Sequence, residues 1–92
     1  MKDAPPEGPE APEAPEANAV LVDARGLNCP LPLLEARRAL ALLPGGATIV
    51  VLATDPAAPN DFIEFTEATG HELADVVEQA GIFRLTLVKR RT

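Results

Sequence analysis

The sequence predicts an α/β (α+β) fold, a two-layer sandwich of βαβαββ order in which two helices cover one face of a four-stranded mixed sheet. Short β-branched apolar runs alternate with segments of helical periodicity, and glycine and proline separate these segments. A turn containing Gly81 joins the last two apolar runs. The 92 residues suffice for one domain with a modest core.

The first half of the domain is predicted to be strand, helix, strand. The first strand is expected over residues 20–23, and the helix from about Pro30 to Leu43. Apolar residues recur on one face of this helix at helical spacing: Leu33, Ala36, Leu40 and Leu43. The run Pro44-Gly45-Gly46 ends the helix, and residues 47–54 are apolar on both faces, as expected of a central strand.

The second half is predicted to be one helix and a hairpin. The helix begins near Asn60 or Asp61 and is closed by Gly70 at its C′ position. Its apolar stripe comprises Phe62, Ile63, Phe65 and Thr69. Strands follow over residues 71–78 and 82–89. In the last strand Phe83, Leu85 and Leu87 are expected to face the core, opposite Arg84 and Thr86.

Residues 1–18 differ from the rest in composition. They have prolines every third residue from Pro6 to Pro15, no large apolar residue beyond Met1, and −4 of the net charge of −6. We expect a disordered, extended tail with polyproline II character, followed by a folded domain at residues 19–92. The spacing matches P-x-x-P, which SH3-like grooves bind, but the acidic composition favours a solubilising spacer.

Composition excludes several classes of protein. One cysteine cannot form an intramolecular disulfide, and one cysteine with one histidine cannot supply a structural zinc site, so we expect neither a metal nor a cofactor. The longest apolar run, residues 47–53, is too short to span a membrane. An acidic N-terminus without an apolar run does not resemble a signal peptide, and we expect a cytoplasmic protein. A pI of 4.6 and few aromatic residues disfavour direct nucleic-acid binding.

The lone cysteine lies where the first helix begins. Cys29 precedes Pro30, which is suited to the first helical position. We expect the free amides of Leu31 and Leu33, with the helix dipole, to favour the thiolate, and Arg25 to add positive potential. The prolines Pro30 and Pro32 stiffen the turn and keep the sulfur exposed. Cys29 is therefore a candidate nucleophile.

Other roles for Cys29 fit the sequence less well. A free cysteine is often a small buried hydrophobe, but the flanking prolines and helix start favour a reactive role here. Without a C-x-x-C pair the chain is not a dithiol oxidoreductase. His71 is expected at the edge opposite Cys29, too far away to serve as a base, which argues against a papain-like hydrolase.

The carboxyl ends of the parallel first and second strands should meet at one edge of the sheet. This edge collects Asp23, the loop from Arg25 to Asn28, residues 54–56 and the start of the second helix. For Asp55 we favour capping of a turn over contact with a partner protein.

The segment from Asp23 to Pro32 has the form D-x-x-G-x-x-C-P-x-P, with Gly26 and Cys29 at the glycine and cysteine positions. It resembles the signature of the TusA/SirA family of small sulfur-carrier proteins, and the similarity extends over about Val20 to Lys89. Two departures are visible. Asn60 stands where many relatives have arginine before the aspartate, and Thr66 stands where some have a second cysteine.

The resemblance implies the βαβαββ sandwich and a function. Cys29 would accept sulfane sulfur as a persulfide from a cysteine desulfurase or rhodanese and pass it to an acceptor protein. Such carriers serve tRNA thiolation, molybdenum-cofactor synthesis or sulfur oxidation. The protein would act as a monomer. Four residues would support the motif: Asp23, Gly26, Pro30 and Pro32. Partner proteins would contact the following residues: Arg25, Asn28, Leu31 and Asp55.

A second hypothesis is a non-catalytic interaction or regulatory module of the same fold. The segment 55–78 has seven acidic residues and no lysine or arginine. Such a run is usually a solvated face, although it also suits a basic partner.

Overall fold

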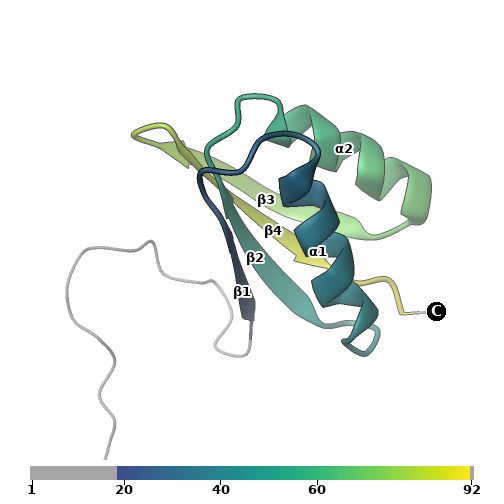
Figure 1. The fold of residues 1–92 in the computed structure, drawn as a ribbon. Coiled ribbons are helices and arrows are strands. Elements are labelled where there is room, and N and C mark those ends of the chain that lie inside the picture. Colours follow the sequence, from purple (N-terminus) through teal and green to yellow (C-terminus); the bar gives the residue numbers. More distant parts are fainter. Residues whose placement is uncertain (1–18, 92) are drawn as a thin grey trace, which may run out of the picture.

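The computed structural model describes residues 19–91 and confirms the predicted fold class (Figure 1). The chain forms β1 (Val20–Ala24), α1 (Leu31–Ala41), β2 (Thr48–Ala53), α2 (Ala58–Thr69), β3 (Glu72–Gln79) and β4 (Ile82–Val88). The sheet order is β1-β2-β4-β3. Strand β1 is parallel to β2, whereas β4 is antiparallel to both β2 and β3, so the sheet is mixed.

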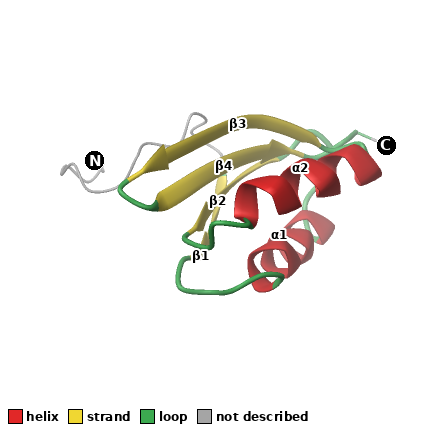
Figure 2. Ribbon diagram, turned by 90° about the horizontal axis from the view of Figure 1, so that it is seen from above, coloured by secondary structure: helices red, strands yellow, loops and turns green. Residues whose placement is uncertain are grey.

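Both helices pack on the same face of the sheet, as Figure 2 shows from above. The register of β1 and β2 pairs Asp23 with Leu52 and Ala24 with Ala53, so the two strands end side by side. The loops that leave these ends lead into α1 and α2. Neither helix of the described chain is long and apolar enough to cross a membrane. The predicted tail at residues 1–18 lies outside the described residues.

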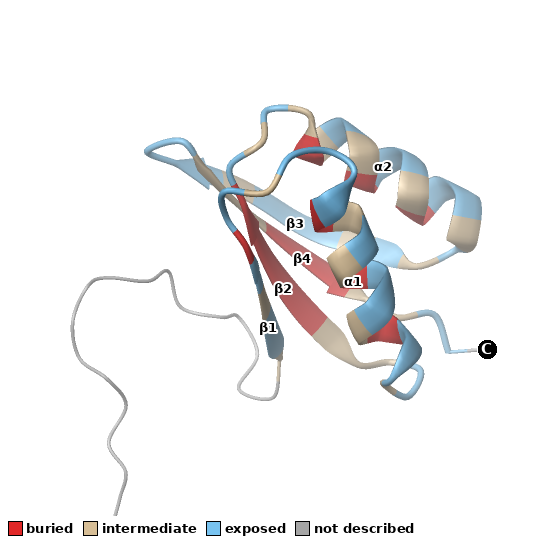
Figure 3. Cartoon of the chain, in the orientation of Figure 1, coloured by how far each residue is buried: buried red, intermediate tan, exposed pale blue. Residues whose placement is uncertain are grey.

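The core lies between the helices and the two central strands (Figure 3). Ala36 and Leu40 of α1 and Phe62 of α2 pack with residues of β2 and β4, and Leu33 and Leu43 are half-buried at its margin. Two side chains depart in burial from a simple alternation of core and surface positions, although Thr86 lies on the predicted face of the sheet. Ile63 is 41% exposed, because Thr66, not Ile63, continues the buried stripe of α2. Thr86 is buried although it faces away from the helices, beside its partner Val50 in the centre of the sheet.

Several predicted ends of elements shift by one to three residues. Helix α1 begins at Leu31 with Pro30 as N-cap, so Pro32 rather than Pro30 occupies the first helical turn. Helix α2 begins at Ala58, earlier than predicted, because Pro59 fits its first turn. Gly70 ends α2 in the left-handed conformation, with φ of 86°, as predicted.

Candidate functional site

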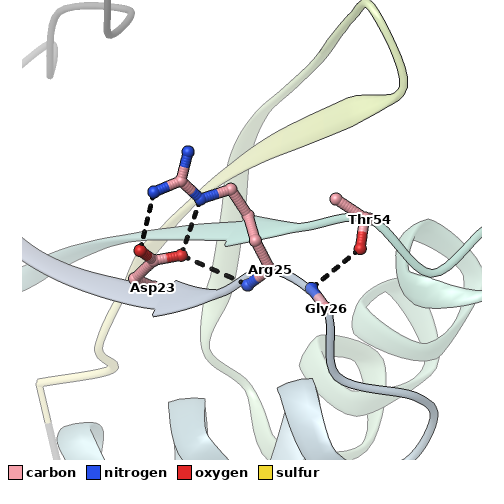
Figure 4. A network of polar contacts seen from close by, with 4 residues as sticks. All are labelled: Asp23, Arg25, Gly26 and Thr54. Carbon is pink, nitrogen blue, oxygen red and sulfur yellow. Dashed lines mark hydrogen bonds and ion pairs between the residues drawn. The ribbon is translucent and has the colours of Figure 1, made fainter.

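The loop after β1 is built by the start of the motif (Figure 4). The Asp23 carboxylate accepts hydrogen bonds from Nε and Nη2 of Arg25, both at 2.8 Å, and from the Arg25 main-chain N–H at 3.2 Å. Gly26 has a φ of 84° and occupies the turn position that requires a left-handed backbone. The Leu27 N–H donates a hydrogen bond to the carbonyl of Ala24 at 3.2 Å, which closes the turn. The motif residues Asp23 and Gly26 therefore shape this turn.

The end of β2 anchors the same loop. Thr54 Oγ1 accepts a hydrogen bond from the Gly26 N–H at 2.9 Å, as Figure 4 shows. One oxygen of Asp55 accepts the main-chain N–H of Cys29, and the other accepts the N–H of Ala57 at 2.9 Å. Asp55 therefore caps the turn before α2, as predicted, and also fixes the backbone of the cysteine. These bonds lower the pKa of the Asp55 carboxyl, the Ala57 bond contributing most.

Cys29 is exposed, one residue before the N-cap of α1. The Cys29–Pro30 peptide bond is cis. The sulfur does not lie in the core, so the alternative of a small buried hydrophobe does not describe this residue. The predicted exposure of the sulfur is confirmed.

The expectation that the surroundings of Cys29 favour the thiolate was wrong, although the helix start itself acts in that direction. The Cys29 Sγ donates a hydrogen bond to Oδ2 of Asp61, in the first turn of α2, at 2.9 Å. This bond is the main cause that raises the pKa of the Cys29 thiol above its ordinary value; desolvation and the charges of Asp61 and Asp55 act in the same direction. A carboxylate next to the sulfur stabilises the protonated form, because it accepts the proton and repels the anion.

Two of the groups expected to favour the thiolate, the Leu31 N–H and the Arg25 guanidinium, are bound elsewhere. The Leu31 N–H donates to the carbonyl of Asn28 at 2.8 Å rather than to the sulfur. The guanidinium of Arg25 is bound to Asp23, which raises the pKa of Arg25 and offsets its charge. The uncompensated charges next to the sulfur are therefore negative.

The remaining predicted residues lie around the cysteine. Asn28 and Leu31 are exposed on either side of the Cys29–Pro30 pair, and Arg25 is exposed on the preceding turn. Pro30 is the exposed N-cap, whereas Pro32 is buried under the first turn of α1. The edge predicted to gather the end of β1, the end of β2 and the start of α2 is formed as expected.

Sequence reasoning missed Asp61 as a contact of the sulfur. The available signal was that the second helix begins at the same edge as Cys29 and carries an acidic residue in its first turn. His71 follows the other end of α2, which ends at Thr69, eight residues or about 12 Å along the helix axis from Asp61. There its Nδ1 accepts the Arg90 N–H at 3.0 Å and its ring contacts Phe65. Burial, followed by the charges of Lys89 and Arg90, lowers its pKa.

Comparison with known proteins places this geometry in a family. The family model described as Sulfurtransferase TusA matches residues 20–89. A putative sulfur carrier protein of Neisseria meningitidis serogroup A is 49% identical over 70 residues, which cover 76% of this chain and 95% of that protein. The sulfur carrier protein TusA of Allochromatium vinosum is 43% identical over 68 residues, which cover 74% of this chain and 90% of that protein.

The fold gives the same result. The crystal structure of a SirA-like protein from Desulfitobacterium hafniense superposes with a TM-score of 0.70 at 27% sequence identity, covering 78% of this chain and 99% of that chain. The matched region contains every element of the sheet and both helices, together with Cys29 and the loop that holds it. The chain therefore belongs to the TusA family of sulfur carrier proteins.

Proposed function

We propose that the protein carries sulfane sulfur as a persulfide on Cys29. The observation that supports this most directly is the exposed Cys29 sulfur on a loop whose backbone is held by Asp55 and Thr54. An exposed nucleophile on an anchored loop suits exchange with a second protein, because the sulfur is accessible and its position is defined. The protein acts as a stoichiometric carrier of the sulfurtransferase type rather than as an enzyme that acts on a small molecule.

The transfer consists of two displacements at sulfur. The Cys29 thiolate attacks the outer sulfur of a donor persulfide, the S–S bond of the donor breaks, and the donor leaves as a thiolate. An acceptor thiolate then attacks the outer sulfur of the Cys29 persulfide, and Cys29 leaves as a thiolate. No net oxidation or reduction occurs, so neither step needs a cofactor.

Partners and cellular context belong to the same proposal. The donor is a cysteine desulfurase or a rhodanese, and the acceptor belongs to tRNA thiolation, molybdenum-cofactor synthesis or sulfur oxidation. We place the carrier in the cytoplasm as a monomer, where a free thiol stays reduced. Arg25, Asn28 and Leu31 surround the sulfur and are the proposed contacts for these partners, with Asp55 at their margin.

The test is the intact mass of the protein after incubation with a cysteine desulfurase and cysteine, or with a rhodanese and thiosulfate. We expect a gain of one sulfur atom that a reductant reverses and that Cys29→Ser abolishes. Circular dichroism checks that Cys29→Ser keeps the fold, which we expect because the side chain is exposed. Uptake by the serine variant contradicts the proposal, and no uptake with either donor favours the interaction module instead.

A further inference from the structure

The Asp61 carboxylate next to the sulfur has no role in the two displacements described above. We propose that Asp61 is a positioning residue of this site, which holds Cys29 as the neutral thiol in the free protein until a partner neutralises the carboxylate. The inference rests on the proposed function, because it concerns when the carrier sulfur becomes a nucleophile. It is carried by the hydrogen bond from Cys29 Sγ to Asp61 Oδ2, at 2.9 Å.

The chemistry of the two groups gives this bond a direction. An ionised carboxylate has acceptor oxygens and no proton to donate, so the proton of the bond belongs to the sulfur. Loss of that proton replaces a hydrogen bond by two negative charges in contact. The geometry therefore stabilises the thiol and penalises the thiolate, which is the reactive form.

The charges around the sulfur do not oppose this effect. From α2 the sulfur faces Asp61, and from the loop before α2 it faces Asp55. From its own loop the nearest cation is Arg25, and both oxygens of Asp23 bind that guanidinium. The raised pKa of Cys29 follows from this set of neighbours, with the Asp61 bond as its main cause.

This role differs from that of a general base, because it concerns the resting state of the free protein and not the transfer step itself. A partner that places an arginine or lysine against Asp61 removes the repulsion, and the N-terminus of α1 then stabilises the anion. The structure thus points to a partner whose docking face carries a cation beside its reactive sulfur.

The experiment measures the rate of alkylation of Cys29 by iodoacetamide against pH in the full chain, with no sulfur donor present. Asp61→Asn keeps the size of the side chain and removes its charge. We expect the midpoint of its pH profile to fall by about one unit, with about tenfold faster alkylation below both midpoints. Glu64→Gln removes an equal charge from an exposed position about one turn further along α2, and it is expected to keep the wild-type pH profile. The alkylation midpoint of Asp61→Glu is expected to lie closer to the wild-type midpoint than that of Asp61→Asn does.

A second measurement does not depend on any variant. The alkylation midpoint of the folded wild-type protein should lie above that of the same chain unfolded in urea. A folded midpoint at or below the unfolded one overturns the inference, as does an unchanged or raised midpoint in folded Asp61→Asn. Because iodoacetamide replaces the donor, failure of sulfur loading contradicts the proposed function without changing this result.

Discussion

The ion pair between Asp23 and Arg25 shapes the turn that leads to the cysteine. Its hydrogen bonds, chiefly that from the Arg25 side chain, lower the pKa of Asp23 from 3.8 to about 2. A carboxyl group whose pKa is lower in the folded protein stabilises the fold above its unfolded pKa and loses this contribution as the pH falls through its folded pKa. The stabilisation is therefore present above about pH 4 and is lost towards pH 2.

Replacing Asp23 tests this contribution. Both side chains are about half exposed, at 49% for Arg25 and 48% for Asp23, so we expect at most about 1 kcal/mol from the pair. Urea unfolding at pH 6 should show Asp23→Asn to be less stable than wild type by up to this amount, and the difference should shrink as the pH falls towards 2. Glu67→Gln, which removes an exposed carboxylate of α2, is the control. If Asp23→Asn lowers the free energy of unfolding equally at both pH values, the stabilisation does not come from the ionised Asp23 carboxylate.

How far the site could be predicted depends on which contacts the motif contains. Asp23, Gly26, Cys29 and Pro32 lie within ten residues, and their local roles follow from turn and helix-start chemistry. The protonation state of the sulfur does not follow from the motif, because it depends on Asp61, which is 32 positions away in the sequence. A helix start alone favours the thiolate, and a single side chain from another element reverses that preference.

The hairpin of β3 and β4 has an unusual residue in its turn. Ala80, with φ of 55°, and Gly81, with φ of 81°, form the two-residue connection between the strands. Positive φ at both positions defines a type I′ turn, for which Asn-Gly is strongly preferred. A left-handed conformation costs an ordinary L-residue about 1–2 kcal/mol, and asparagine tolerates it better than alanine.

Ala80→Asn is therefore expected to stabilise the protein. We expect a gain of about 0.5–1 kcal/mol, because asparagine relieves part of the left-handed cost of alanine. For a domain of this size such a gain raises Tm by a few degrees, measurable by thermal unfolding followed by circular dichroism. The matched variant Ala68→Asn, at an exposed helical position of α2, should lower Tm, because asparagine is a weaker helix former than alanine. A lower Tm for Ala80→Asn contradicts this account of the turn.

The helices and strands could be predicted well because characteristic glycine and turn residues mark where they end. Gly70 and the turn at Gly81 mark ends that the structure has at the expected places. Helix α2 begins earlier than the start near Asn60 or Asp61 that the sequence predicts, because Pro59 occupies its first turn. Proline is compatible with a first turn as well as with a loop, so local chemistry alone does not distinguish the two.

At the scale of the molecule, one helical layer has to cover one face of the sheet. Phe62 contributes most to this layer, because it is the largest of the fully buried side chains. It projects from α2 into the cluster formed with β2 and β4, one residue after Asp61. The packing of Phe62 therefore also holds the start of α2 against the loop of Cys29.

Phe62→Ala is expected to destabilise the whole domain. Removing a fully buried phenylalanine costs about 3–5 kcal/mol, a large part of the 5–15 kcal/mol typical of a folded protein. Urea unfolding of this variant should shift to much lower urea concentrations, whereas Leu42→Ala, at a residue that is 86% exposed, should change stability by no more than about 0.5 kcal/mol. Because Phe62 also seats the helix that carries Asp61, Cys29 in Phe62→Ala should react with iodoacetamide at a midpoint nearer that of the unfolded chain. A loss of stability below 1 kcal/mol for Phe62→Ala would show that α2 does not depend on this side chain to cover the sheet.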